Sequence, residues 1–191
     1  MKDENRIKAE AGIKNLLTHL GQDPTREGIV DTPKRVVKAM TEMTEGYYME
    51  PKLILERQFA SEGYDDLVVV RGIRFSSMCE HHLLPFIGEA SVAYMPRDKV
   101  VGLSKLPRLV ECYARRLQLQ EKMTREIADA IQKYLDPIGV GVHVRAQHQC
   151  MACRGVKQQD ADMVTTTVLG SLREDKCLKD EFIEAVYHTN G

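Results

Sequence analysis

The sequence has no excess of charge of either sign and no long apolar run. Its 27 Lys and Arg residues nearly balance 28 Asp and Glu residues, so the formal net charge is −1. A chain this close to neutrality is not expected to bind nucleic acid or a membrane surface through bulk electrostatics, although a local basic pocket for a small anion is compatible with it. No stretch approaches the ~20 apolar residues that span a bilayer. We therefore expect neither a nucleic-acid partner nor a membrane partner.

The sequence also lacks a disulfide framework, a secretory signal, internal repeats and low-complexity segments. Its five cysteines are odd in number, and the charged opening MKDENRIKAE has no apolar core of a signal peptide. These features predict a cytoplasmic protein with reduced thiols. The chain has 191 residues, of which 43% are hydrophobic, and this is enough for one domain, or for one domain with an N-terminal extension. Weak net charge also makes self-association unsurprising.

Two helices are expected in an N-terminal helical extension, residues 1–50. Apolar residues recur at helical spacing over residues 4–20, and Gly21 is a natural terminator. A second helix should begin near Thr32, which can cap it, because Pro33 suits a first helical turn. These helices carry no obvious chemistry, so we interpret them as packing or oligomer-forming arms.

Residues 51–191 are predicted to form a catalytic α+β domain. The pattern predicts strands at 66–75, 88–94, 140–146 and 163–169, and helices at 104–116, 119–135 and 177–187. Two consecutive helices interrupt paired strands. Such an order indicates an antiparallel sheet with two helices gathered on one face.

Cysteine and histidine concentrate in two short segments, 79–82 and 148–150. Zinc favours this mixture of sulfur and nitrogen donors. Cys79 and His82 are three residues apart, so one turn can direct both to one ion, and Cys150 would add a third ligand from far along the chain. Three protein ligands and a water form the catalytic arrangement. Each segment then keeps one further histidine that could move protons, His81 and His148.

Spacing alone leaves two other interpretations open. Cys150 and Cys153 form a C-x-x-C pair, so Cys79, His82, Cys150 and Cys153 could make a closed four-ligand site. The protein would then be an interaction module built around a structural zinc. Alternatively, the cysteines are ordinary buried thiols, which is a common environment for cysteine. The adjacent histidines weigh against this second alternative.

Polar residues outside these segments indicate binding of an anionic substrate. Ser104, Lys105 and Arg108 lie at a predicted helix N-terminus, where free N–H groups and the helix dipole favour phosphate, and Arg154 adds a cation just after the second segment. The alternative is that these are solvated surface charges. Glu121 starts the next helix, where its carboxylate could favour the dipole or accept the paired N–H donors of a guanine edge.

The order of these motifs resembles that of GTP cyclohydrolase I, in its long zinc-dependent form. The matching strings are Ser-Met-Cys-Glu-His-His at 77–82, Gly-Leu-Ser-Lys at 102–105, Gln-Leu-Gln-Glu at 118–121, His-Gln-Cys at 148–150 and Arg-Gly at 154–155. Residues 32–36 and the threonines at 165–167 also match. The resemblance covers nearly the whole chain, and several separated motifs in the right order make it specific.

The resemblance implies a function and a set of roles. The expected enzyme converts GTP and water to 7,8-dihydroneopterin triphosphate and formate, the first step of pterin and folate biosynthesis. It implies that Cys79, His82 and Cys150 bind Zn²⁺, that His81 and His148 handle protons, and that Glu121 anchors guanine. Ser104, Lys105, Arg108 and Arg154 resemble the ribose and triphosphate contacts. A related enzyme acting on another purine or pterin is the alternative within the same fold.

The resemblance also implies the architecture. Members of this family have the tunnelling fold, an antiparallel sheet with two helices on one face. They form homodecamers of two stacked pentamers, with each active site between subunits. The expected partners are therefore GTP and further copies of the chain.

Overall fold

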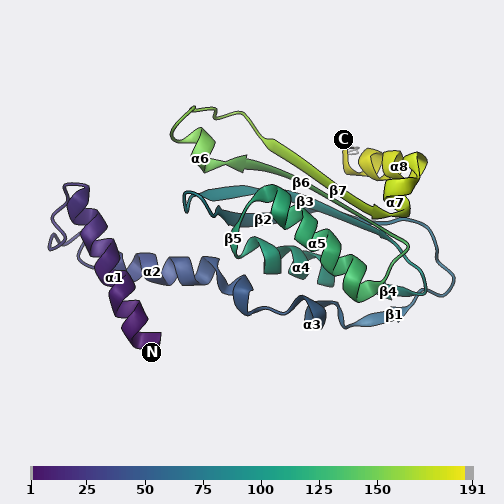
Figure 1. Ribbon diagram of the computed structural model, residues 1–191, viewed down its shortest axis with the longest axis horizontal. Helices are drawn as coiled ribbons and strands as arrows, with labels where there is room; N and C mark the ends of the chain where they lie inside the picture. Colours follow the sequence, from purple (N-terminus) through teal and green to yellow (C-terminus); the bar gives the residue numbers. More distant parts are fainter. Residues whose placement is uncertain (1, 188–191) are drawn as a thin grey trace. The chain divides into compact units, whose positions relative to one another are not determined.

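The computed structural model describes residues 2–187, which divide into two compact units, Met1–Glu45 and Gly46–Gly191. The first unit contains α1 (Lys2–His19) and α2 (Thr32–Met43), which pack against each other (Figure 1). Both expected helices are present. Asp31 rather than Thr32 occupies the N-cap position of α2, and Pro33 lies in its first turn as expected.

The first unit buries little of its apolar surface. The side chains of Ile7, Leu16, Leu20 and Val30 are all at least half exposed, and none of the residues of α2 is buried. Helices this short gain most of their stability from packing an apolar face. Exposed apolar side chains in such a unit indicate a surface that another chain can cover.

The second unit is built on a five-stranded sheet in the order β5-β2-β3-β6-β7. The four long strands pair antiparallel, and their bounds are β2 (Val68–Cys79), β3 (Pro85–Met95), β6 (Gly139–His148) and β7 (Met163–Gly170). The short β5 (Leu117–Gln118) pairs parallel with the end of β2. A separate two-stranded sheet joins β1 (Gln58–Ala60) to β4 (Lys99–Val101).

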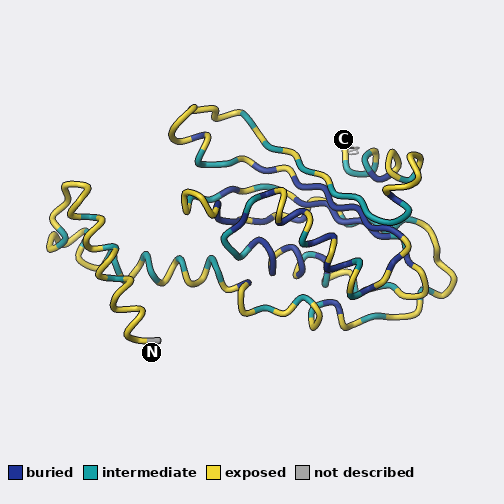
Figure 2. The backbone as a smooth tube through the Cα atoms, viewed as in Figure 1, coloured by how far each residue is buried: buried dark blue, intermediate teal, exposed yellow. Residues whose placement is uncertain are grey.

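Helices cover both faces of this sheet. The long helices α4 (Lys105–Ala114) and α5 (Gln120–Leu135) pack on one face over the main core, and Figure 2 shows the buried positions along β3, β6 and these helices. Strand β6 alternates as expected, and Val140, Val142, Val144 and Ala146 are its buried positions facing α5. The remaining helices are η1 (Glu45–Tyr48), α3 (Pro51–Leu55), α6 (Gln149–Ala152), α7 (Ser171–Glu174) and α8 (Lys176–Tyr187).

The expected α+β class with two helices on one face of the sheet is confirmed by this arrangement. The opposite face also carries a small cluster, in which α7 and α8 pack through Leu172 and Phe182 against Ala93 of β3. The predicted final helix belongs to this second cluster. Within residues 2–187, no helix is both long and apolar enough to cross a membrane.

The backbones of β3 and β6 leave no room for a side chain at Gly88. A Cβ added at Gly88 would lie 2.0 Å from the carbonyl oxygen of Arg145 and 2.6 Å from the Cα of Ala146. Because both atoms belong to the backbone, Gly88→Ala must push the two strands apart, and we expect a loss of about 2 kcal/mol or more of unfolding free energy. Urea unfolding measures this loss. Gly12→Ala is the control, because its added Cβ meets no atom within 4 Å; an equal effect of both changes would contradict the assignment.

Candidate functional site

The predicted ligand residues converge at one end of the large sheet. Cys79 ends β2, His82 lies in the turn that leads to β3, and Cys150 lies in α6 directly after β6. Their donor atoms all lie within 4.8 Å of one another, and the Cys79 Sγ lies 3.8 Å from the His82 Nδ1. Two sulfurs and one imidazole nitrogen are a donor set that fits zinc. The group could therefore hold one metal ion.

A tight turn brings His82 back towards Cys79. The N–H of Leu83 donates to the carbonyl of Cys79 at 2.9 Å, and the N–H of Cys79 donates to the carbonyl of Leu84 at 2.9 Å. Leu83 adopts a left-handed conformation, with φ of 53°. This pairing closes the hairpin directly at the candidate ligands. Cys79 is buried, Cys150 is half-buried and His82 is exposed, so one side of the group stays accessible.

The protonation of the Cys150 thiol depends on its burial and on nearby charges. Burial raises the pKa of the Cys150 thiol, and the neighbouring Cys79 raises it further because two thiolates would repel each other. The positive charge of Arg154 acts in the opposite direction and lowers the pKa of the thiol. A metal ion binds the thiolate form, so its charge would offset both effects and binding would release protons.

Cys153 does not join this donor group among the residues that the structure describes. Its side chain is exposed, and its Sγ donates to the carbonyl of Gln149 at 2.9 Å. The closed four-ligand site therefore receives no support from the geometry. The structure leaves three protein donors, which is the number that keeps a position open for water.

His148 lies at the end of β6, immediately beside the donor group. Its ring stacks on Phe86 of the neighbouring strand, with ring centroids 4.6 Å apart and planes 2° apart. Its Nε2 lies 2.9 Å from the Oε1 of Gln120, the first residue of α5. Burial lowers the pKa of His148, whereas the charge of Glu121 raises it. His81 is exposed and lies next to His82, with the two rings edge to face at 6.2 Å.

Glu121 belongs to the same end of the sheet. It occupies the first turn of α5 and is exposed, and it directly follows Gln120, whose side chain contacts His148. The segment before it is tied to the candidate ligands, because the N–H of Glu80 donates to the carbonyl of Gln118 at 3.1 Å. Glu121 and His148 thus lie where α5 begins and β6 ends, and His81 and Arg154 lie on the segments that carry the candidate ligands.

Three of the predicted substrate contacts lie elsewhere. Ser104 precedes α4, and Lys105 and Arg108 lie in its first turns. Helix α4 has ten residues, so it is about 15 Å long, and its far end leads into β5 beside Cys79 (Figure 1). Within one chain these residues are therefore a helix length from the donor group. Ser104 also makes no side-chain cap hydrogen bond to α4.

Two residues that contact His148, Gln120 and Phe86, were not predicted from the sequence. Gln120 lies inside the matched string at 118–121, where Glu121 is the residue with a chemically distinctive side chain. Phe86 follows Pro85 at the start of β3, and its partner across the strands is His148. Only the register between β3 and β6 reveals this pairing. A prediction of that register from the sequence would have placed Phe86 beside His148.

A cavity of about 740 Å³ lies on the opposite face of the sheet, beside α8. Its lining includes Arg71, Ser91, His143, Arg145 and Tyr187. Burial lowers the pKa of His143, and Arg145 beside it acts in the same direction. None of the predicted site residues lines this cavity. The donor chemistry therefore lies at the sheet end, away from this hollow.

The fold and the donor set together describe an α+β protein with a Cys-His-Cys group that could hold a metal ion. The family model for GTP cyclohydrolase I matches residues 9–187, so the chain belongs to the GTP cyclohydrolase I family. The GTP cyclohydrolase 1 of Synechococcus sp. strain JA-2-3B'a(2-13) is 47% identical over 181 residues, which cover 95% of this chain and 79% of that protein. The GTP cyclohydrolase 1 of Synechococcus sp. strain JA-3-3Ab is 48% identical with the same coverage. The predicted family is confirmed by these matches.

A weaker likeness concerns a solved structure. The apo crystal structure of the archaeosine synthase QueF-Like aligns with a TM-score of 0.45 and 21% sequence identity, over 55% of this chain and 93% of that chain. The family to which this chain belongs is metal-dependent, in agreement with the Cys-His-Cys group.

Proposed function

We propose that this chain converts GTP and water to 7,8-dihydroneopterin triphosphate and formate. The observation that carries the proposal is the convergence of Cys79, His82 and Cys150 with His148 at one end of the sheet, in a chain of the GTP cyclohydrolase I family. The product would enter pterin and folate biosynthesis. An interaction module around a structural zinc is not favoured, because Cys153 bonds to Gln149 instead of joining the donor group.

The proposed metal is zinc, held by Cys79, His82 and Cys150. When bound, zinc supplies a water whose pKa is lowered towards ~7, so that hydroxide is available at neutral pH. The three side chains would hold the ion beside the turn that joins β2 to β3. Histidine and thiolate donors in this number match catalytic rather than structural zinc sites.

The spare histidines would move the protons of the reaction. His148 would protonate N7 of the purine while water adds at C8, and a second hydrolysis would release C8 as formate. The opened ribose would then rearrange and close onto the freed amine to form the pterin. His81, exposed beside His82, would exchange protons with the solvent side. Imidazole is the side chain best suited to proton transfer near neutral pH.

The remaining contacts would position the substrate. The carboxylate of Glu121 would accept N1–H and the amino group of guanine, and Arg154 would contact the triphosphate. Ser104 and Lys105 lie at the start of α4, a helix about 15 Å long, and Arg108 lies in its first turn, so we propose that a neighbouring subunit contributes them. This supports a homo-oligomer with shared active sites, a decamer of two pentamers in the family arrangement. The half-exposed apolar side chains of the first unit, such as Leu16, support the same assembly.

Metal removal and reloading test the proposed function. The purified protein is treated with a chelator, assayed with GTP for formate and for a fluorescent oxidised pterin, and then reloaded with one equivalent of zinc. We expect both products to disappear and to return together. Formation of both products by the metal-free protein would contradict the role of the Cys-His-Cys group.

His148→Ala should slow turnover while the metal stays bound. His148 is not part of the donor group, and loss of a general acid–base residue usually slows a reaction by ~10²-fold or more. Formate release and zinc content are measured on the same preparation. His19→Ala, in the exposed end of α1, is the control and should behave as wild type. Normal formate release by His148→Ala would exclude it as the proton donor.

A further inference from the structure

We infer that Gln120 and Thr165 are positioning residues that hold His148 in one tautomer, with the Nε2 proton directed at Gln120 and Nδ1 left to exchange protons. The inference rests on the proposed function, because it concerns the histidine that would protonate the purine. Neither residue need touch the substrate for this role. Their contribution would be to decide which ring nitrogen carries the reactive proton.

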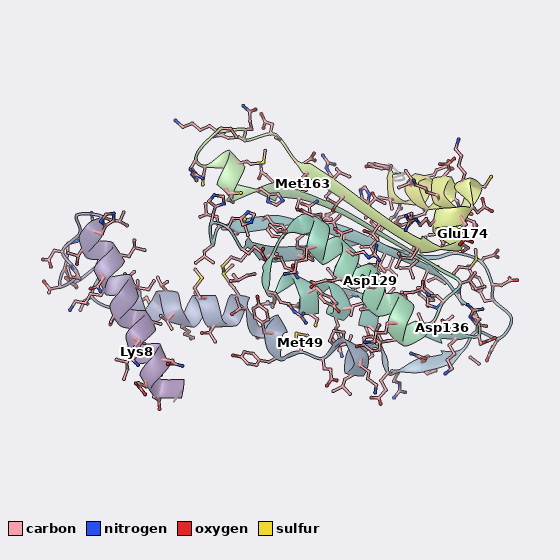
Figure 3. All side chains as sticks on the ribbon, in the orientation of Figure 1. Lys8, Met49, Asp129, Asp136, Met163 and Glu174 are labelled. Carbon is pink, nitrogen blue, oxygen red and sulfur yellow. The ribbon has the colours of Figure 1, made fainter. Side chains whose placement is uncertain are left out.

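Three acceptors together orient the Gln120 amide, namely two backbone carbonyls and the hydroxyl oxygen of Thr165. The side chain is 1% exposed. Its Nε2 lies 3.1 Å from the carbonyl oxygen of Val144 and 2.9 Å from that of Met163. Met163 begins β7 and is labelled in Figure 3. Carbonyl oxygens only accept hydrogen bonds, so the amide group facing them must be the NH₂. The Oε1 therefore faces the other way, towards His148.

This orientation determines the proton position on His148. The Oε1 of Gln120 lies 2.9 Å from the His148 Nε2 and can only accept, so Nε2 must carry a proton. Stacking on Phe86 fixes the plane of the ring. A neutral His148 then presents its lone pair at Nδ1, and a protonated His148 can deliver a proton from Nδ1 without breaking its bond to Gln120. Histidine tautomers are commonly set in this way by the partner of the other nitrogen.

Two threonines extend the same logic. The Thr124 Oγ1 lies 2.7 Å from the backbone carbonyl of Gln120, so the Thr124 hydroxyl must donate to that carbonyl. It also lies 2.7 Å from the Thr165 Oγ1, and since its own proton is already used, Thr165 must donate to it. The Thr165 oxygen therefore offers a lone pair to the Gln120 Nε2 at 3.1 Å. The donor and the acceptor of each hydrogen bond in this network are therefore determined.

The Thr165 hydroxyl oxygen is therefore a third acceptor for the Gln120 NH₂, beside the carbonyls of Val144 and Met163. A rotated Gln120 amide would place its Oε1 against the carbonyls of Val144 and Met163 and against the Thr165 lone pair, with no donor to meet it. Thr165 is the member that can be changed with the least damage, because β7 favours β-branched residues and valine has nearly the same shape. The Thr165 hydroxyl thus helps to orient the Gln120 amide towards His148.

The experiment compares Thr165→Val with Thr165→Ser in zinc-loaded protein. Valine removes the hydroxyl, whereas serine keeps it. We expect kcat for formate release to fall about tenfold or more in Thr165→Val, with KM and zinc content near wild type, and to recover in Thr165→Ser. Thr166→Val is the matched control, because it also removes a hydroxyl from β7. That hydroxyl lies 2.9 Å from the Nδ1 of His143 on β6. Thr166→Val should leave kcat unchanged.

A spectroscopic measurement separates positioning from a merely structural effect. Ring ¹⁵N spectra of histidine-labelled, zinc-loaded protein, with His148→Asn as the difference reference, report which nitrogen of His148 is protonated. We expect a single Nε2–H signal in wild type and Thr165→Ser, and a mixture in Thr165→Val. A neutral ring protonated at Nδ1 in wild type, unchanged kcat in Thr165→Val, or no recovery in Thr165→Ser would each overturn the inference. If wild type releases no formate from GTP, the proposed function fails, whereas the ¹⁵N result still decides the tautomer.

Discussion

Replacing Cys150 with serine is expected to remove both the bound zinc and the turnover, whereas replacing Cys153 with serine leaves both near wild type. Cys150 is one of three donors within 4.8 Å of one another, and a serine hydroxyl is a poor ligand beside a thiolate and an imidazole. The Cys153 thiol instead donates a hydrogen bond to the backbone carbonyl of Gln149, four residues earlier. We expect turnover to fall by ~10²-fold or more in Cys150→Ser.

Zinc per chain and formate release measured together decide this prediction. The two substitutions are chemically identical and lie three residues apart, so each is the control for the other. Loss of zinc from Cys153→Ser would favour the four-ligand structural site. Retention of both zinc and activity by Cys150→Ser would remove it from the ligand set. In either case the three-ligand centre would be wrong.

The second large effect concerns the choice of base. A carboxylate can accept two N–H donors from guanine, whereas adenine presents an acceptor at N1. A site whose polar groups are left unpaired rejects such an analogue by ~10⁴-fold or more. If Glu121 anchors the base, GTP should turn over and ATP should not. Glu121→Gln should raise the KM for GTP, because its amide NH₂ would meet an N–H of guanine, while zinc content and oligomeric size stay unchanged.

The matched control for this prediction is Asp129→Asn on the exposed side of the same helix. Asp129 pairs with Arg125 at 2.8 Å and lies two turns further along α5. If Glu121 only favours the helix dipole, Glu121→Gln would change stability by a few tenths of a kcal/mol to ~1 kcal/mol and leave the KM for GTP unaltered. An unchanged KM would therefore defeat the guanine-anchor role.

The main elements of the fold were predictable because their patterns are regular. Strand β6 alternates valine with smaller or polar residues, and α5 has an apolar stripe, so both were located within a few residues. The predicted strand at 66–75 stopped short of the true end of β2 at Cys79. The last residues of β2 include Ser77, which is polar and yet buried. Hydropathy does not indicate the burial of a serine. The two-residue β5 is too short for any periodicity, and only its pairing with Cys79 defines it.

The donor group was predictable because its residue types are rare and chemically specific. Cys79 and His82 come from one turn, and the strand register brings Cys150 to them. The cations were less predictable, because closeness in sequence to the ligand segments suggested closeness in space. Helix α4 separates Lys105 from the group by its own length. The contact between Gln120 and His148 depends on how α5 packs on β6, which no local pattern encodes.

The most direct measurement follows the fate of purine C8. Zinc-loaded protein is incubated with GTP labelled with ¹³C at C8, and the products are followed by ¹³C NMR together with pterin fluorescence after oxidation. The account predicts that the label appears as formate, one equivalent for each pterin formed. Label that remains in a purine or pterin ring, or GTP consumed by loss of phosphate without formate, would contradict it.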